Sequence, residues 1–418
     1  MKILLINPPF YRFVGLEQDY VPLSLLSVGA WLEKDGHKVS ILNLEVGSNL
    51  KYVGYSGRSN SYNNYLKQVE DTNHLIWNEL RNTIVKEKPD TVGITILNVK
   101  SKSAKKIISI LQNEYPHIDI VVGGYHPTIE PEEYLGDVEV IRGEFESTVR
   151  LENLDNLPYF NYDSLLNTYS KNGYAHIVTA RGCPFKCKFC CSKLLWNRKV
   201  TYKSIDRLLK EMKLIEDTFH SDLFTIWDET FTISNKRLLD FCSRYSLASK
   251  WSCDTRADVL NEEKIVMMKN AGCAHMGIGV ECGSDKSLKI IGKNETIQTI
   301  RTTAELLYKH GVLWKAYCII GFPHETEQDI IETIEFIKSL TPFRIVLSFF
   351  TPYKGTDLYE DCLKQNLITT DFDLAMYSHQ SPYNYFCPNI EKEKWIQLRN
   401  SVSKSVDNYN KDSIKIWR

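Results

Sequence analysis

Three cysteines that could bind a metal centre lie close together in the spacing C-x3-C-x2-C, at Cys183, Cys187 and Cys190. They follow a short apolar segment, residues 176–180, that we expect to form a β-strand, so one loop would carry all three thiolates. Three thiolates are one fewer than the four that usually hold a cubane iron–sulfur cluster, and the open iron could bind a substrate or cofactor. The alternative is a structural zinc site, but zinc needs a fourth ligand in tetrahedral geometry, and the adjacent Cys191 is poorly placed to provide it.

The composition of the chain is that of an ordinary globular protein. It has 418 residues, of which 43% are hydrophobic and 25% charged, with a net charge of −1. This neutrality provides no field that would attract nucleic acid or anionic lipid. No segment reaches the roughly 18 apolar residues of a membrane helix, and the apolar start ends at Asn7-Pro8-Pro9, too early for a signal peptide. We therefore expect a cytoplasmic protein that binds neither nucleic acid nor membrane.

The distribution of cysteines supports a reducing compartment. None of the eleven precedes Cys183, four lie within residues 183–191, and the other seven are scattered. A secreted disulfide framework would show neither this clustering nor this chain length. A thiolate-bound cluster in the cytosol fits better, and we expect Cys191 and the scattered cysteines to be buried structural thiols.

The first 150 residues alternate between expected strands and helices. Strands are expected at residues 2–6, 38–44, 91–97, 118–122 and 138–141, with helices at 23–34, 75–88 and 103–115. Residues 46–65 are rich in Ser, Asn, Gly and Tyr, and we expect a long loop there. This α/β pattern predicts a Rossmann-like, doubly wound parallel sheet.

Ligands of such sheets bind beyond the carboxyl ends of the strands. The candidate binding residues at that edge are Asn7, Pro8, Thr95, Asn98, Gly123 and Gly124. Paired glycines would let a bulky ligand approach the backbone closely. Taken alone, however, the glycine pair predicts only a turn.

A second βα series follows a polar segment, residues 151–172, that we interpret as a linker. Its strands are expected at residues 176–180, 222–226, 251–256, 275–280, 313–320 and 344–350, and its helices at 205–219, 236–248, 262–270, 296–309 and 327–340. Six βα units are too few for an eight-stranded barrel, so residues 173–369 predict a partial (β/α)6 barrel of the TIM type with its site at the carboxyl ends. Residues 370–418 form a small C-terminal extension with a helix at 391–405.

At these residues the chain resembles the radical S-adenosylmethionine (SAM) superfamily, and within it the cobalamin (B12)-binding subclass. The resemblance covers about residues 1–365. It implies that Cys183, Cys187 and Cys190 hold a [4Fe–4S] cluster whose open iron binds the amino and carboxylate groups of SAM. Phe189 matches the family position whose backbone lies near the adenine.

Further segments resemble motifs of the subclass at the ends of the later strands, namely residues 227–231, 254–258, 277–284, 319–326 and 354–356. The resemblance implies that Glu229 contacts the SAM amino group, that Arg256 pairs with its carboxylate, and that Glu281 holds a ribose hydroxyl. Alternatively, Arg256 and Glu281 form an ordinary ion pair of the barrel. Glu325 is as readily a first-turn acid that stabilises a helix dipole.

The N-terminal half resembles cobalamin-binding Rossmann domains through Asn7-Pro8-Pro9, residues 121–128 and Arg142-Gly143-Glu144-Phe145-Glu146. Residues 35–40 nearly spell the D-x-H-x-x-G that supplies a lower histidine ligand in other cobalamin enzymes. However, Ser40 replaces the glycine, and the segment leads into the second strand instead of leaving the first. We interpret His37 as a surface turn residue and expect a cobalamin without a histidine lower ligand.

The resemblance implies an enzyme that makes a 5′-deoxyadenosyl radical with an electron from a flavodoxin- or ferredoxin-type donor. The first hypothesis is a B12-dependent methyltransferase acting on an unactivated carbon of a small metabolite or natural-product intermediate. The second keeps both cofactors but ends in dehydration, reduction, ring contraction or cyclisation. The third is a non-enzymatic cobalamin sensor or carrier, against which the cysteine loop argues. A methylthiotransferase would need a second cluster on N-terminal cysteines, and residues 1–182 contain none.

Overall fold

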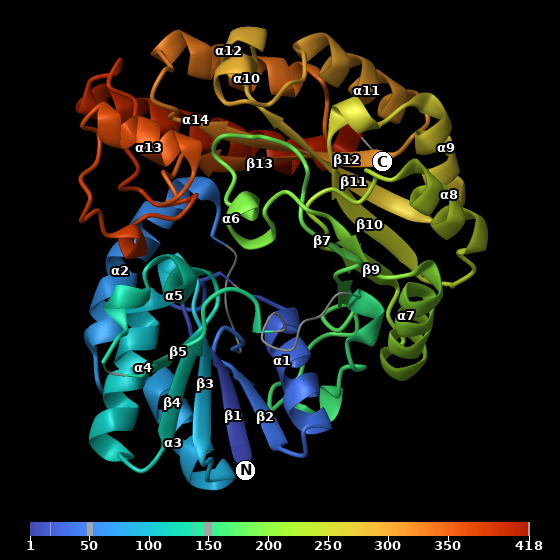
Figure 1. The fold of residues 1–418 in the computed structure, drawn as a ribbon. Coiled ribbons are helices and arrows are strands. Elements are labelled where there is room, and N and C mark those ends of the chain that lie inside the picture. The colour runs from blue at the N-terminus through green and yellow to red at the C-terminus, as the bar shows by residue number, and fades with distance from the viewer. Residues whose placement is uncertain (17, 48–52, 137, 146–152, 417–418) are drawn as a thin grey trace. The chain divides into compact units, whose positions relative to one another are not determined.

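The computed structural model describes residues 1–16, 18–47, 53–136, 138–145 and 153–416 (Figure 1). The chain forms two compact units. Unit 1 comprises Met1–Val53, Gly57–Tyr174 and Asp373–Tyr377, and unit 2 comprises Gly54–Ser56, Ala175–Phe372 and Ser378–Arg418. Residues 146–150 of the expected first domain, 151–152 of the expected linker and 417–418 of the expected extension lie outside the described residues. The domain limits expected from the sequence stay predictions.

Unit 1 contains a five-stranded parallel sheet in the order β2-β1-β3-β4-β5. The strands are β1 (Lys2–Asn7), β2 (Lys38–Asn43), β3 (Thr91–Thr95), β4 (Asp119–Gly123) and β5 (Glu139–Val140), which confirms the five expected strands. The strand order reverses between β1 and β3. In open α/β sheets, the crevice outside the carboxyl ends at such a reversal is the usual place for a ligand.

The two faces of this sheet are covered by different helices because side chains alternate along β1. Leu4 and Ile6 pack into one core with helices α2 (Arg58–Glu70), α3 (Leu75–Glu87) and α4 (Ser101–Glu114). Ile3 and Leu5 pack into the other core with α1 (Leu23–Lys34). Figure 1 shows α1 on one face of the sheet and α3 and α4 on the other. A short helix, α5 (Tyr125–Ile129), follows β4.

Residues within the expected linker, 151–172, are packed into unit 1. Leu154 and Leu157 contact Trp31 of α1 in a small apolar cluster, and Tyr169 is buried in the α1 core. Burial of these apolar side chains fixes this polar-looking segment onto the unit.

The loop expected over residues 46–65 is wrong for its second half, because α2 begins at Arg58. The Ser and Asn residues of α2 have low helix propensity. Nevertheless Tyr62, Tyr65 and Val69 are spaced to share one helix face and are buried, and the Tyr62 and Tyr65 rings lie 5.5 and 4.9 Å from the ring of Phe10. Packing of this face outweighs local propensity. Residues 48–52 of the expected loop lie outside the described residues.

Unit 2 contains a six-stranded parallel sheet in the order β13-β12-β11-β10-β9-β6. The strands are β6 (His176–Ile177), β9 (Leu223–Ile226), β10 (Lys250–Thr255), β11 (Cys273–Glu281), β12 (Leu313–Ile320) and β13 (Arg344–Phe349), as expected. Ala180, expected in the first strand, instead begins an antiparallel pair, β7 (Ala180–Arg181) with β8 (Thr201–Tyr202). This pair encloses the cysteine loop.

The helices of unit 2 lie mainly along one face of its sheet, and Figure 1 shows α7 to α12 in this position. The expected helices are confirmed as α7 (Ile205–Phe219), α8 (Asn235–Arg244), α9 (Glu262–Asn270), α11 (Ile297–Lys309) and α12 (Glu327–Ser339), with α6 (Ser192–Trp196), α10 (Asp285–Ile290) and α13 (Asp357–Lys364) in addition. Along β12 and β13, buried residues alternate with half-buried ones. One face of this partial barrel is therefore sealed, and the other, the inner face, is partly exposed.

The last helix, α14 (Lys392–Ile416), is longer than the helix expected at 391–405 and covers the edge strand β13. The side-chain amide of Asn410 accepts a hydrogen bond from Ile345 N (2.7 Å) and donates one to Ile345 O (2.9 Å). The Ser413 hydroxyl donates to Phe343 O at 2.7 Å. These side chains occupy backbone groups that an uncovered edge strand would offer to other chains.

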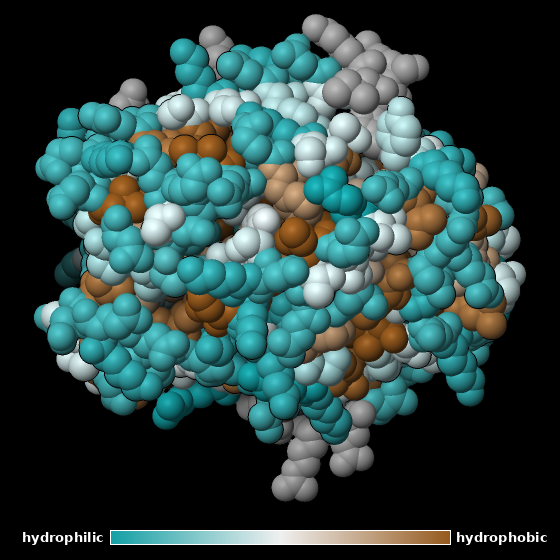
Figure 2. Space-filling view, turned by 90° about the horizontal axis from the view of Figure 1, so that it is seen from above, coloured by the Kyte–Doolittle hydropathy of each residue, from teal (hydrophilic) through white to brown (hydrophobic). Residues whose placement is uncertain are grey.

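Across the described residues, the helices are all too short or too polar to cross a membrane. Figure 2 shows hydrophilic side chains over most of the face in view, with apolar ones in scattered patches.

Trp251 provides a test of the sealed core of unit 2. Its side chain is fully buried, its ring lies 5.6 Å from Phe231 and 5.2 Å from Phe241, and its indole N–H donates to Ala271 O at 2.7 Å. We expect Trp251→Ala to lower the free energy of unfolding by about 3–5 kcal/mol because a large cavity replaces the ring. Thermal unfolding would measure the loss. Leu239→Ala, at an exposed position on α8, is the control and should leave the unfolding midpoint almost unchanged.

Candidate functional site

The cysteine loop connects β7 with α6, at the carboxyl end of the first strand of the barrel. It begins at Gly182, whose φ is +92°, and a Cβ there would lie 2.0 Å from Lys199 O. Only glycine fits this turn. Cys183, Cys187 and Cys190 are half-buried, and all eleven cysteines are free. The structure therefore brings the three predicted thiols together on one loop.

Backbone contacts from distant segments hold this loop in place. Lys188 N donates to Ile291 O at 2.8 Å, and Lys188 O accepts from Leu358 N at 3.1 Å. Arg198 Nη1 donates to Phe185 O at 2.6 Å. The loop is thus fixed by residues from α10, α13 and the β7–β8 connection, which favours a preorganised ligand set.

The arrangement of the thiols fits a cluster better than a single zinc ion. Zinc needs four ligands about 2.0–2.3 Å from one centre. Over the described ranges, no three His, Cys, Asp or Glu side chains surround one such centre. Three cysteines of a cubane cluster bind three different irons, so their sulfurs need not converge on one point. The donor set, three free half-buried thiols on a rigid loop, fits a [4Fe–4S] cluster.

Burial and nearby cations act in opposite directions on these thiols. Burial raises the pKa of Cys187, whereas the positive charges of Lys293 and Arg256 lower it. Burial raises the pKa of Cys190 to about 12. Metal binding would therefore displace protons from the loop, and the adjacent cations would stabilise the resulting thiolates.

Arg256, at the end of β10, lies beside the loop. Its Nη1 is 3.6 Å from Cys187 Sγ, and its guanidinium stacks 4.0 Å from the centre of the Phe185 ring. Asp258 binds it in a bidentate manner at 2.9 and 2.6 Å, and Glu295 lies 3.5 Å away. The predicted contact of Arg256 with the SAM carboxylate stays a prediction, since its fork is directed here to Asp258.

Glu281 and Arg256 do not pair with each other among the described residues, but each forms ion pairs with other residues of the barrel. Lys293 Nζ instead lies 3.4 Å from Glu281 Oε1 and 3.4 Å from Glu295 Oε2. Lys293 and Glu295 are buried and were missed from the sequence. The sequence marks them only as two charged residues in the segment after α10, directly beyond Gly292. Pairing makes burial of these charges tolerable.

The backbone at Glu281 is held in an unusual conformation. Its φ is +64°, in the left-handed region that non-glycine residues rarely occupy. The register between β11 and β12 shifts at this point, between Gly279 and Glu281. Such irregularities redirect a side chain, here toward Lys293.

Glu229, after β9, lies against the start of the cysteine loop. Gly182 N donates to Glu229 Oε2 at 3.2 Å, and the Ser192 hydroxyl donates to Oε1 at 3.3 Å. Its exposed carboxylate is accessible, as the predicted contact with the SAM amino group requires.

The neighbouring Asp228 was missed from the sequence. It is buried and accepts hydrogen bonds from Thr179 N (2.6 Å) and Ala180 N (2.9 Å). Burial raises its pKa to about 6. This carboxyl group ties the end of β9 to the segment that enters the loop.

Phe189 lies on the loop with its ring 6.0 Å from that of Phe322, which follows β12. Glu325 holds this second segment, since its Oε2 accepts from Gly321 N (2.7 Å) and Phe322 N (2.9 Å). Glu325 is not a first-turn acid, because α12 is capped by Thr326 and begins after it. The expected dipole role is therefore wrong.

The predicted residues of unit 1 lie at the ends of adjacent strands, where most are bound by the protein itself. Asn7 donates to Asn43 Oδ1 (2.8 Å) and accepts from Lys100 Nζ (2.7 Å). Lys100 also pairs with Glu45 Oε1 at 2.8 Å, and Pro8 is buried beside Asn7. Glu45 and Lys100 were missed, although each closely follows a predicted strand.

The ends of β3 and β4 form a second polar group. Asn98 Oδ1 lies 2.9 Å from His126 Nδ1. A Cβ on Gly124, whose φ is +102°, would lie 3.1 Å from Thr95 Oγ1, and Gly123 precedes it at the end of β4. The glycine pair is thus needed by the chain's own turn, and its role toward cobalamin stays a prediction.

Two further features lie away from these edges. His37 lies in the turn between α1 and β2, at the amino end of β2, as expected of a turn residue.

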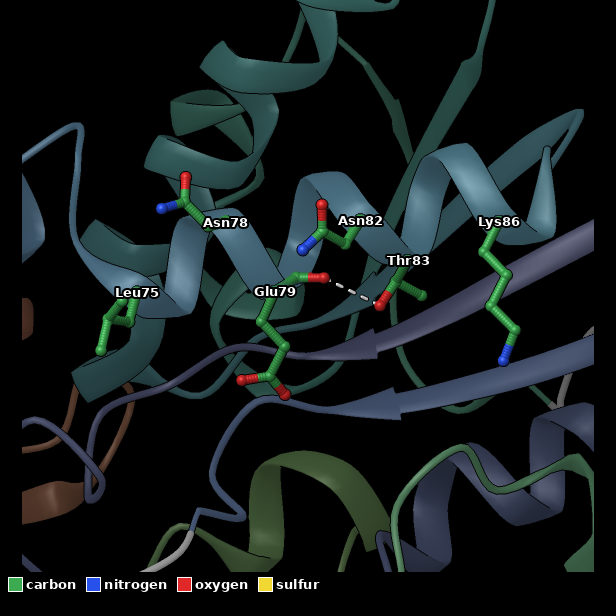
Figure 3. A pocket seen from close by; sticks show the side chains of 6 residues that line it. All are labelled: Leu75, Asn78, Glu79, Asn82, Thr83 and Lys86. Carbon is green, nitrogen blue, oxygen red and sulfur yellow. Dashed lines mark hydrogen bonds between the residues drawn. The ribbon is translucent and has the colours of Figure 1, made fainter.

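A hollow of about 410 Å³ runs along α3 and is lined by Leu75, Asn78, Glu79, Asn82, Thr83 and Lys86 (Figure 3). All six side chains come from one helix, so the hollow lacks the converging elements of an active site.

Two family models match the chain. Residues 177–337 match the Radical SAM superfamily, and residues 13–151 match the B12 binding domain. The chain is a radical SAM enzyme with a B12-binding domain. The radical SAM domain implies a [4Fe–4S] cluster and SAM, and the second domain implies cobalamin.

Similar proteins agree with this assignment. The "Uncharacterized methyltransferase PH0819" of Pyrococcus horikoshii is 28% identical, over 88% of this chain and 85% of that protein. The anaerobic magnesium-protoporphyrin IX monomethyl ester cyclase of Rubrivivax gelatinosus is 23% identical, over 81% and 68%. The structure of the radical SAM methyltransferase TsrM from Kitasatospora setae, with cobalamin and [4Fe–4S] cluster bound, superposes with a TM-score of 0.68 at 15% identity, over 96% and 90%. This last likeness concerns the fold.

Glu325 makes the stability of this radical SAM enzyme depend on pH. Burial raises its pKa to about 8, and no cation pairs with it among the described residues. Since an unfolded glutamate titrates near 4.5, the folded state loses stability as the pH rises from about 5 to about 8. We expect Glu325→Gln, which stays neutral, to flatten the fall of the unfolding midpoint over this range. Glu332→Gln, at an exposed position on α12, should keep the wild-type slope, and equal slopes for all three proteins would contradict the assignment.

Proposed function

We propose that this enzyme is a B12-dependent methyltransferase that acts on an unactivated carbon of a small molecule. The observation that carries the proposal is the rigid loop with three free thiols at the carboxyl end of a partial barrel, in a chain that also has a B12-binding domain. The Pyrococcus relative that is named a methyltransferase supports it over most of both chains.

In this proposal Cys183, Cys187 and Cys190 hold the cluster. When bound, the cluster and SAM supply a 5′-deoxyadenosyl radical and the cobalamin supplies a methyl group. Arg256, beside Cys187 Sγ at 3.6 Å, stabilises thiolate charge. The backbone anchors of the loop would hold the reacting groups in a fixed position at the strand ends.

Four other residues of unit 2 would orient SAM. Glu229 offers an exposed carboxylate to its amino group, and Arg256 a guanidinium to its carboxylate. Glu281 would accept from the ribose, and the Phe189 backbone would lie near the adenine. In unit 1, Asn7, Pro8, Thr95, Asn98, Gly123 and Gly124 would form the edge of the cobalamin site, which the Lys100–Glu45 pair would keep rigid.

A second candidate is a radical SAM enzyme that uses the same cofactors without methyl transfer. The similarity to a protein named as an anaerobic cyclase favours it. The two candidates differ in one product, because only methyl transfer consumes a SAM molecule to S-adenosylhomocysteine.

The proposed partners follow from the chemistry. A flavodoxin- or ferredoxin-type protein would donate the electron. The eleven free cysteines suit the reducing cytoplasm. With a net charge of −1, we propose a small-molecule substrate rather than nucleic acid.

Replacing the loop cysteines tests the ligand set. Wild-type protein reconstituted without oxygen should contain roughly four iron and four sulfide ions per chain. We expect the Cys183→Ala, Cys187→Ala, Cys190→Ala triple variant to lose both, together with its visible absorbance. The adjacent Cys191→Ala is the matched control and should keep them. Loss of iron in the control, or its retention in the triple variant, would contradict the assignment.

The products of SAM distinguish the two candidate functions. Protein reconstituted with iron, sulfide and hydroxocobalamin is incubated with SAM and titanium(III) citrate, and the nucleosides are quantified by mass spectrometry. A methyltransferase should form S-adenosylhomocysteine, up to one per bound cobalamin, in addition to 5′-deoxyadenosine. Formation of 5′-deoxyadenosine alone would reject methyl transfer in favour of the second candidate.

A further inference from the structure

The inner face of the unit 2 sheet carries a row of polar side chains that the cofactor site does not use. Asp254, Gly277, Lys315 and Arg344 occupy neighbouring register positions on β10, β11, β12 and β13. Asp254, Lys315 and Arg344 are half-buried, whereas buried residues lie next to them along each strand. A row of charges on the accessible face of a parallel barrel is a feature of a binding surface rather than of a core.

Gly277 leaves room for a hydrogen bond that crosses this row. The Tyr317 hydroxyl donates to Asp254 Oδ1 at 3.0 Å. A Cβ on Gly277 would lie 2.1 Å from Asp254 Oδ1 and 2.5 Å from the Tyr317 ring. This hydrogen bond orients the Asp254 carboxylate and occupies its Oδ1 atom. The carboxylate is therefore positioned by the Tyr317 hydroxyl.

Lys315 is the exceptional member of the row. It forms no hydrogen bond or ion pair within the part of the chain that the structure describes. Burial lowers its pKa, as does Arg344, whereas Asp254 raises it. The Lys315 charge and burial together lower the pKa of His275, on the same face, to about 4, so that His275 is neutral. A half-buried ammonium without a hydrogen-bonding partner loses hydration, and the Coulombic attraction to Asp254 offsets only part of that loss.

The row lies directly next to the charges beside the cysteine loop. Gly279 is two residues beyond Gly277 on the same face of β11, which corresponds to roughly 7 Å along the strand. A Cβ on Gly279 would lie 2.4 Å from Glu281 Oε1 and 2.8 Å from Lys293 Nζ. The inner face is thus polar from the cysteine loop down to Lys315.

We propose that Lys315, together with Arg344 and the Asp254–Tyr317 pair, binds the carboxylate group of the small-molecule substrate. This inference rests on the proposed function, since it deepens the substrate class of the same barrel. Lys315 supplies one cation without a hydrogen-bonding partner in the described chain, which matches a monoanion. A phosphate dianion would be repelled by Asp254 and find only one unpaired cation. The ammonium and the planar guanidinium can donate to the two carboxylate oxygens.

The test measures binding to the whole holoenzyme, so its result does not depend on methyl transfer. Equilibrium dialysis with radiolabelled benzoate, in the presence of SAM, compares wild-type protein with Lys315→Met and Lys315→Arg. Benzamide serves as a probe of the same size as benzoate without its charge. Inorganic phosphate serves as a probe of higher charge. The control variant is Lys309→Met, on α11, whose side chain is 63% exposed. Circular dichroism establishes that each variant is folded, and iron content establishes that it contains the cluster.

We expect wild-type protein to bind benzoate more tightly than benzamide or phosphate, and Lys315→Met to weaken benzoate by about tenfold or more, because a charge-assisted hydrogen bond is lost. Lys315→Arg should restore most of the affinity, and Lys309→Met should bind as wild type. Equal affinity of wild type and Lys315→Met for benzoate would overturn the proposal, as would tighter binding of phosphate. Absence of S-adenosylhomocysteine would overturn only the proposed methyl transfer, and leave the benzoate comparison standing.

Discussion

Pairing of buried charges is the constraint on which the carboxyl end of the barrel depends. Lys293 is 3% exposed and lies between Glu281 and Glu295, while Glu295 also lies 3.5 Å from Arg256. Removing any one member would leave an uncompensated charge in a poorly hydrated place. The pairs therefore join β10, β11 and the segment after α10 into one unit. Because Arg256 also contacts Cys187, the same charges set the environment of the loop that holds the cluster.

The two sheets differ in how far their polar side chains are paired within the protein. In unit 1, Asn7, Glu45 and Lys100 fill the edge with bonds among themselves, which makes it rigid before any ligand arrives. In unit 2, the glycines of β11 admit the Asp254–Tyr317 bond and the Glu281–Lys293 pair, while Lys315 on the inner face has no hydrogen-bonding partner in the described chain. The first arrangement satisfies its polar groups internally, whereas the second leaves one cation uncommitted.

The sequence was sufficient to predict the strands, most helices and the three thiols, since these depend on short-range periodicity and spacing. It failed where tertiary packing decides. The Ser and Asn residues of α2 are typical of a loop, yet Tyr62 and Tyr65 of this helix pack against Phe10. Glu295 lies about 40 residues after Arg256, and Lys293 lies 12 residues after Glu281, and partners at such separations leave no local signal. Glu325 was misassigned because a carboxylate just before a helix resembles a first-turn acid, and only the structure reveals its bonds to Gly321 and Phe322.

The C-terminal helix has a consequence for how the chain is made. Asn410 pairs with Ile345, and Asp407 accepts from the backbone of Tyr55, so unit 2 joins segments that lie 352 residues apart in the chain. The edge of β13 therefore stays bare until α14 has been synthesised, and a nascent chain that still lacks this helix presents an open strand edge to other chains.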